Sequence, residues 1–130
     1  MVKFKDNVIK LQFISLLIIP IVPHLDFFLF LHLHDIPVIL FTKNAGVLNQ
    51  NICQNIDFEC LAIDQNLPKI WVKNNIQKKY NKVIQGNLDN ILLCYGSREE
   101  IKNEVLDILD SFNGESFVFN LGHGILKDTP

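Results

Sequence analysis

The feature that most constrains the fold is an alternation of short apolar runs with longer, helix-like segments beyond residue 34. The apolar runs cover residues 36–43, 60–64, 82–87 and 115–125, and most are followed by polar side chains. Nearly continuous apolar runs are typical of parallel strands that are buried on both faces. The pattern therefore predicts an α/β protein with parallel strands and right-handed helical crossovers. Periodicity leaves two architectures open, half of an eight-fold barrel and an open α/β sheet.

The clearest helix is predicted over residues 98–112. Its apolar side chains recur at steps of three and four: Ile101, Val105, Ile108, Leu109 and Phe112. Ser97 stands where an N-cap is needed, and Glu100 completes the pattern of a capping box. Residues 45–56 also fit a helix, and residues 67–80 are expected to begin with a helical turn.

Length and composition exclude several classes of protein. The chain has 130 residues, too few for a complete (β/α)8 barrel of about 250 residues. A hydrophobic content of 48% argues against disorder, and a net charge of -2 without a basic run argues against nucleic-acid binding. The three cysteines form no CxxC pair. They are expected to be buried thiols of a reducing compartment, which predicts a cytoplasmic protein.

The chain divides by composition into an apolar N-terminal segment, residues 1–34, and a remainder, residues 35–130, that holds all six glycines. The most apolar stretch runs from residue 11 to residue 33, and three lysines precede it, as in a signal peptide. No small-residue cleavage site follows. Polar residues and prolines interrupt the run: Pro20, Pro23, His24, Asp26 and His32. A membrane span is therefore disfavoured, and a buried helix is the simpler expectation.

Two histidines in this segment raise the question of a metal site. His32 and His34 alternate, so on a strand they would share one face, and His24 or Asp26 could add a ligand. One His-x-His pair is a weak signal because nothing fixes the geometry of further ligands. We therefore predict no metal site.

The polar residues that follow the predicted strands are the candidates for chemistry, because sites in barrels and open α/β sheets form at the carboxyl ends of strands. They are Lys43, Asn44, Asp64, Asn87, Asp89 and His123. Lys43 and His123 could donate to an anionic ligand. Alternatively, Lys43 and Asp64 pair with each other, and Asp89 caps a short turn over residues 90–93.

His123 is the strongest of these candidates for a ligand-binding role. It lies between Gly122 and Gly124, so the backbone on both sides can bend closely around a ligand. An imidazole titrates near neutral pH and can hydrogen-bond a carboxylate or relay a proton. The alternative is a histidine that is hydrogen-bonded at a strand end for structural reasons.

Five motifs, in order, resemble the uroporphyrinogen decarboxylase family. They are IPVILFTKNAG at 36–46, LAID at 61–64, QGNLD at 85–89, LCYGSREEI at 93–101, and FNLGHGI at 119–125 followed by DTP at 128–130. The resemblance implies that residues 35–130 are the C-terminal half of a (β/α)8 barrel, with four parallel strands and an incomplete ring. It also implies decarboxylation of the four acetate side chains of uroporphyrinogen, giving coproporphyrinogen for haem biosynthesis, without a metal or organic cofactor.

The resemblance maps one substrate-contacting group onto this chain, the histidine of the Asn-Leu-Gly-His-Gly motif, at His123. The family's Arg-Gln-Ala-Gly-Arg type segment and its aspartate, tyrosine and serine contacts are absent, and Gln65 stands where tryptophan is usual. The chain alone is therefore expected to be inactive. Its expected partners are the tetrapyrrole substrate and either a separately encoded N-terminal half or a second copy.

Two other readings stay open. A cobamide-dependent methyltransferase of the same barrel superfamily would need a His/Cys zinc site, for which the sequence offers no suitable cysteine pair. A small membrane-associated or interaction protein without catalysis would use residues 8–33 as its anchor.

Overall fold

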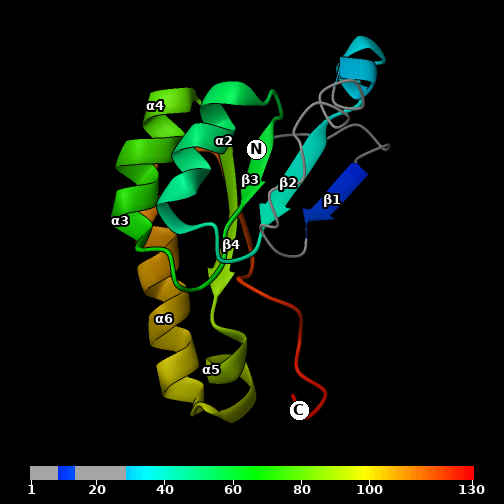
Figure 1. The fold of residues 1–130 in the computed structure, drawn as a ribbon. Helices are drawn as coiled ribbons and strands as arrows, with labels where there is room; N and C mark the ends of the chain where they lie inside the picture. Colours follow the sequence, from blue (N-terminus) through cyan, green and yellow to red (C-terminus); the bar gives the residue numbers. More distant parts are fainter. Residues whose placement is uncertain (1–8, 14–28) are drawn as a thin grey trace.

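A computed structural model describes residues 9–13 and 29–130, and its centre is a parallel five-stranded sheet (Figure 1). The strands lie in chain order: β1 (Ile9–Phe13), β2 (Val38–Thr42), β3 (Cys60–Ala62), β4 (Val83–Leu88) and β5 (Phe117–Leu121). Each strand pairs in parallel with the next along the chain. The four predicted parallel strands, β2 to β5, are confirmed by this pairing.

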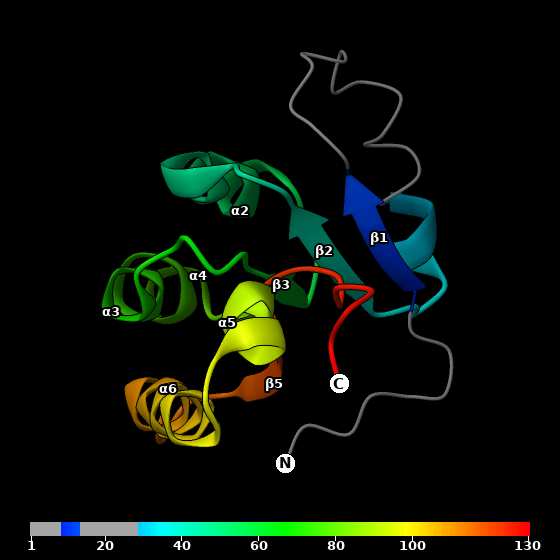
Figure 2. The same cartoon turned by 90° about the horizontal axis from the view of Figure 1, so that it is seen from below.

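The connections after β2, β3 and β4 are helical, as the alternating pattern predicts. The elements are η1 (Gly46–Leu48), α2 (Asn49–Asn55), α3 (Lys69–Val72), the π-helical turn η2 (Lys73–Gln77), α4 (Lys78–Tyr80), α5 (Asn90–Tyr95) and α6 (Arg98–Ser111). Figure 2 shows α2, α3, α4 and α6 on one side of the sheet. The protein is thus α/β with parallel strands that alternate with helices.

Helix α6 begins at the predicted residue, Arg98, and ends at Ser111, one residue before the predicted end. The Ser97 side chain accepts a hydrogen bond from the Glu100 N–H, and the Glu100 carboxylate accepts one from the Ser97 N–H at 2.8 Å, which completes the capping box. Ile108 and Phe112 are buried, and the Phe112 ring stacks on Phe117 of β5 at 4.4 Å. The capping box fixes the start of the helix, and the apolar face of the helix packs against the sheet.

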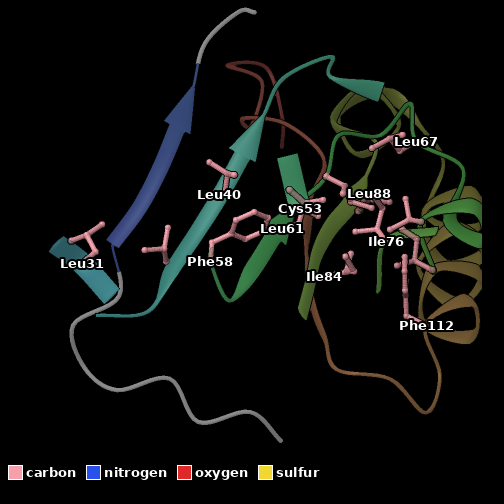
Figure 3. Packing of buried hydrophobic residues seen from close by; sticks show 14 residues of the cluster. Leu31, Leu40, Cys53, Phe58, Leu61, Leu67, Ile76, Ile84, Leu88 and Phe112 are labelled. Atoms are coloured by element: carbon pink, nitrogen blue, oxygen red, sulfur yellow. The ribbon is translucent and has the colours of Figure 1, made fainter. Parts of the chain in front are cut away.

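The main hydrophobic core lies between the sheet and the helices (Figure 3). Alternate strand residues such as Leu40, Leu61 and Ile84 point into it and are at most 1% exposed. Burial of each such side chain stabilises the fold by about 1.5–3 kcal/mol. Leu31, in a short helical stretch over residues 29–33, extends the core at the end near β1.

The N-terminal segment differs from expectation where it is described. Residues 9–13 form β1, a strand in register with β2 from Ile9↔Val38 to Phe13↔Thr42, so the expected buried helix does not include them. The sequence IKLQF alternates apolar and polar residues, a strand signal that the longer apolar run beside it obscures. Residues 14–28, which carry most of the proposed membrane or helical segment, lie outside the described residues.

His32 and His34 do not share a strand face. His32 belongs to the helical stretch, and its Nδ1 lies 3.4 Å from a carboxylate oxygen of Asp57, while the His34 ring contacts Phe30 at 4.4 Å. Across residues 9–13 and 29–130, no helix is both long enough and apolar enough to cross a bilayer.

Candidate ligand site at the carboxyl ends of the strands

Asp64 joins the ends of β2 and β3. It is 2% exposed, and its two carboxylate oxygens accept hydrogen bonds from the N–H groups of Asn44 and Asn66, each at 3.0 Å. Charge-assisted bonds of this kind are stronger than neutral ones. Asp64 therefore holds two loops together, and the ion pair with Lys43, which was one alternative from the sequence, does not form.

Gly122 brings the segment after β5 against the end of β3. A Cβ atom at this position would lie 2.4 Å from the Gln65 backbone nitrogen, which is a clash. The Gly122 N–H donates to the Leu88 carbonyl at 2.8 Å, and the Asn90 side chain donates to the Gly124 carbonyl at 2.7 Å. The glycine is thus required by close packing of backbone on backbone.

His123 is half-buried, and its two ring nitrogens have different surroundings. Nδ1 accepts a hydrogen bond from the Gly124 N–H at 2.9 Å, while Nε2 is buried and has no hydrogen-bond partner among the described residues. An Nδ1 that accepts cannot carry the proton of the neutral ring, so Nε2 carries it and is a donor. The ring meets Phe41 of β2 edge to face, with centroids 6.1 Å apart.

The sheet face opposite the core, here called the inner face, is defined by four residues in register across β2 to β5: Phe41, Ala62, Gln85 and Val118. Gln85 is 9% exposed, and Asn87, two residues further along β4, is 5% exposed. Within residues 9–13 and 29–130, Gln85 Oε1 and Asn87 Oδ1 are buried without a hydrogen-bond partner. Such an unsatisfied acceptor costs about 1–3 kcal/mol, which is unusual unless a ligand or another chain completes it.

Asn87 is anchored by its other side-chain atom. Its Nδ2 donates to the carbonyls of Asp64 and Leu67 at 3.3 and 3.2 Å, so its free oxygen has a fixed direction. The preceding residue, Gly86, has φ +142°, and a Cβ there would lie 2.8 Å from the Ile63 carbonyl oxygen. Sequence reasoning singled out Asn87 by its place at the end of the predicted strand over residues 82–87, and the structure places it inside β4. It overlooked Gln85, because a glutamine inside a strand run carries no functional signal.

The remaining candidates have structural roles or no contact with this site. Asp89 caps α5: its carboxylate accepts from the Ile91 N–H at 2.8 Å, which confirms the capping alternative. Thr42 at the end of β2 donates to Asn49 at 2.6 Å. Among the described residues, no group of three or more histidine, cysteine or acidic side chains is placed to hold a metal ion.

The fold and this arrangement define an α/β protein with a parallel sheet and a candidate ligand site at its strand ends. The uroporphyrinogen decarboxylase (URO-D) family model matches residues 22–130. The chain therefore belongs to the uroporphyrinogen decarboxylase family.

Individual relatives agree with this assignment. The chain is 44% identical over 96 residues to uroporphyrinogen decarboxylase of Wolbachia sp. subsp. Drosophila simulans, which covers 74% of this chain and 27% of the relative. It is 40% identical over 96 residues to the Neorickettsia sennetsu enzyme, covering 74% and 29%, respectively. It is 39% identical over 94 residues to the Rickettsia canadensis enzyme, covering 72% and 26%. The chain thus spans little more than a quarter of the length of these curated relatives.

Proposed function

We propose that this chain is the C-terminal part of a uroporphyrinogen decarboxylase barrel and contributes His123 to its tetrapyrrole site. The observation that carries the proposal is the imidazole itself, whose Nε2–H is a buried donor beside the strand ends with no acceptor in the part of the chain that the structure describes. A carboxylate is the natural acceptor for such a donor, and uroporphyrinogen presents carboxylates around its rim.

The chemistry needs a proton, a positioned substrate and stabilisation of a cation. A proton adds to a pyrrole carbon, and the cationic ring accepts the electron pair of the carbon–carboxyl bond as carbon dioxide leaves. A second proton converts the side chain to methyl, and the ring carbon releases the first, so each acetate consumes one proton net. His123 would hold a substrate carboxylate or assist proton transfer, while the group that stabilises the cation lies outside this chain.

In this proposal the barrel is completed by another polypeptide segment. Four of the five strands and their helices, all within residues 35–130, would be the last four units of a (β/α)8 ring. A separately encoded N-terminal half, or a second copy of the chain, would supply the missing part. The complex would be cytoplasmic, would need no cofactor, and the chain alone would be inactive.

The test is co-expression with the N-terminal portion of a relative, such as the Wolbachia enzyme, followed by assay for coproporphyrinogen. The pair is expected to be active, and His123→Asn in the pair is expected to lower activity strongly while the complex still assembles. A pair that assembles in soluble form but makes no coproporphyrinogen would contradict the proposal. Partitioning of the chain into membranes would favour the alternative of a membrane-associated interaction protein.

A further inference from the structure

The two edges of the sheet are β1 and β5. They stand at opposite ends of the strand order, and every pair between them is parallel (Figure 1). No strand within residues 9–13 and 29–130 pairs with the outer side of β5, and Phe119 in the middle of this strand is 42% exposed. An uncovered edge strand is a template for pairing with another chain. β5 is therefore a place where a further strand can add.

The backbone hydrogen bonds of β5 show which of its groups are free. The Ser116 carbonyl before the strand and the Gly122 N–H after it both bond to β4, at 3.3 and 2.8 Å. Backbone groups of successive residues in a strand point to alternate sides, so the N–H groups of residues 117, 119 and 121 point away from β4. The Leu121 N–H donates to the side chain of the preceding residue at 2.8 Å. The N–H groups of Phe117 and Phe119 are thus the open donors of this edge.

β1 adds one strand–helix unit to those that the family match accounts for. It lies before the matched region, which begins at residue 22, and it pairs in parallel with β2 over five positions. The chain returns to β2 through the helical stretch at residues 29–33, whose Leu31 is 1% exposed and belongs to the same core as Leu40 of β2. A strand followed by a helix that packs on the sheet is the repeating unit of a barrel. The chain therefore provides five consecutive strands.

The number of strands limits what can complete the barrel. An eight-stranded ring that contains these five strands has room for three more. A second copy of the chain would bring five further strands, which is too many for such a ring. β1 also occupies the side of β2 on which a preceding strand would pair. Strands of a partner can therefore add only at the outer sides of β5 and β1.

We infer that the partner of this chain is a polypeptide of three strand–helix units, which inserts between β5 and β1 while β1 stays paired with β2. This inference rests on the proposed function and selects between the two partners that were left open there. The match to the Wolbachia relative covers 27% of that protein. The remainder is long enough for three such units and for a fourth, which would duplicate β1 and compete with it for β2.

The test compares two N-terminal portions of the Wolbachia relative, one that ends after its third strand–helix unit and one that ends after its fourth. Both are co-expressed with the tagged 130-residue chain, and their recovery with the chain is normalised to their amounts in the lysate. The three-unit portion is expected to form a one-to-one complex by light scattering. It should be recovered in about tenfold excess, because tethered β1 competes with the fourth unit at an effective concentration of about millimolar.

Amide hydrogen exchange locates the contacts in the complex. The N–H groups of Phe117 and Phe119 should exchange at least about tenfold more slowly in the three-unit complex than in the chain alone, because a partner strand then bonds to them. The amides of residues 9–13 should keep the protection that they have in the chain alone, because β1 stays paired with β2.

Two variants of Phe119 separate backbone pairing from side-chain contact. Phe119→Pro removes an N–H that points away from β4, which an edge strand tolerates, whereas Phe119→Ala keeps this N–H and shortens the side chain. The urea midpoints of the two variants, each measured on the chain alone, should be similar. Recovery of the three-unit complex should be at least about tenfold lower for Phe119→Pro than for Phe119→Ala, because the proline cannot donate to the partner strand.

The outcomes separate this inference from the function on which it rests. Preference for the four-unit portion, with faster exchange of residues 9–13, overturns the inference because the partner then replaces β1. A homodimer of the chain that makes coproporphyrinogen without a partner also overturns it, as does unfolding of Phe119→Pro alone, which would place that N–H against β4. A three-unit complex that assembles but makes no coproporphyrinogen contradicts the proposed function and leaves the inference intact. Failure of both portions to bind contradicts both proposals.

Discussion

The imidazole of His123 contacts the ring of Phe41 edge to face, at a centroid distance of 6.1 Å and an interplanar angle of 87°. The two residues come from the ends of β5 and β2, which are separated in the sheet by β3 and β4. The segment after β5 therefore crosses the ends of two strands before it places the imidazole. The Phe41 ring packs against the imidazole of His123 and fixes its orientation, because aromatic pairs of this geometry are favourable beyond their buried area.

Replacement of Phe41 by leucine tests this positioning role. Leucine keeps most of the apolar volume but removes the aromatic partner, so stability should fall by about 1–2 kcal/mol. Affinity for uroporphyrin should fall severalfold, because the Nε2–H of His123 is no longer held in one direction. Urea denaturation and absorbance titration measure the two effects. Unchanged affinity would mean that the edge-to-face contact does not position the imidazole.

The two glycines that flank His123 should respond differently to alanine. Gly122→Ala places a methyl group 2.4 Å from the Gln65 nitrogen, whereas a Cβ at Gly124 meets nothing within 4 Å. Relief of the first clash needs backbone movement, so Gly122→Ala should destabilise the protein by about 1–3 kcal/mol or prevent folding. Gly124→Ala should stay within about 0.5 kcal/mol of wild type. If Gly122→Ala and Gly124→Ala lost the same amount of stability in thermal denaturation, the close packing at Gly122 would be refuted.

Asp64 is predicted to be a stability residue that can be separated from substrate chemistry. In Asp64→Asn, one of the two N–H donors, from Asn44 or Asn66, would face an amide NH2 instead of a carboxylate oxygen. We expect a loss of about 2–3 kcal/mol in urea denaturation. Asp89→Asn is the matched control, because asparagine caps helices as well as aspartate does and should change stability by less than about 0.5 kcal/mol. If Asp64→Asn left the stability in urea unchanged, the hydrogen bonds of Asp64 to the loops after β2 and β3 would be dispensable for stability.

The capping box of α6 predicts a pH dependence. Hydrogen bonds from the Ser97 side chain and backbone lower the pKa of Glu100 below its ordinary value of 4.5. A lowered folded-state pKa gives stability above the unfolded-state pKa, and that stability is lost as pH falls through the folded-state value. Ser97→Ala should cost about 1 kcal/mol at neutral pH and should weaken the acid dependence. Urea denaturation at neutral pH and at pH ~3 measures the stability loss and its acid dependence. If Ser97→Ala left the acid dependence unchanged, the Glu100 carboxylate of the capping box would not be its source.

Much of the fold follows from local sequence. The strands β2 to β5 are predicted because runs such as residues 36–43 are apolar on both faces, and α6 is predicted because spacing and capping agree. β1 escaped prediction because its alternation of five residues adjoins a longer apolar stretch. The π-helical turn at Lys73–Gln77 has no sequence signal that we can identify.

The candidate site is predictable only in part, because its contacts join residues that are distant in sequence. Glycine neighbours and a strand end point to His123, but its contact with Phe41 depends on how the last segment crosses the sheet. The same holds for Asp64, which accepts a hydrogen bond from the Asn44 N–H across two loops instead of pairing with Lys43, the alternative that the sequence offered. Gln85 is recognisable only when the register shows its apolar neighbours and the structure shows its free oxygen.

The most direct test of the account is a crystal structure of the chain, assembled with the N-terminal portion of a relative and soaked with uroporphyrin I. The measured quantity is the distance from His123 Nε2 to the nearest ligand carboxylate oxygen. The account predicts a hydrogen bond of about 2.7–3.2 Å, with the ring still against Phe41. An Nε2 that instead donates to a protein carbonyl, with the ligand carboxylates bound elsewhere, would contradict it.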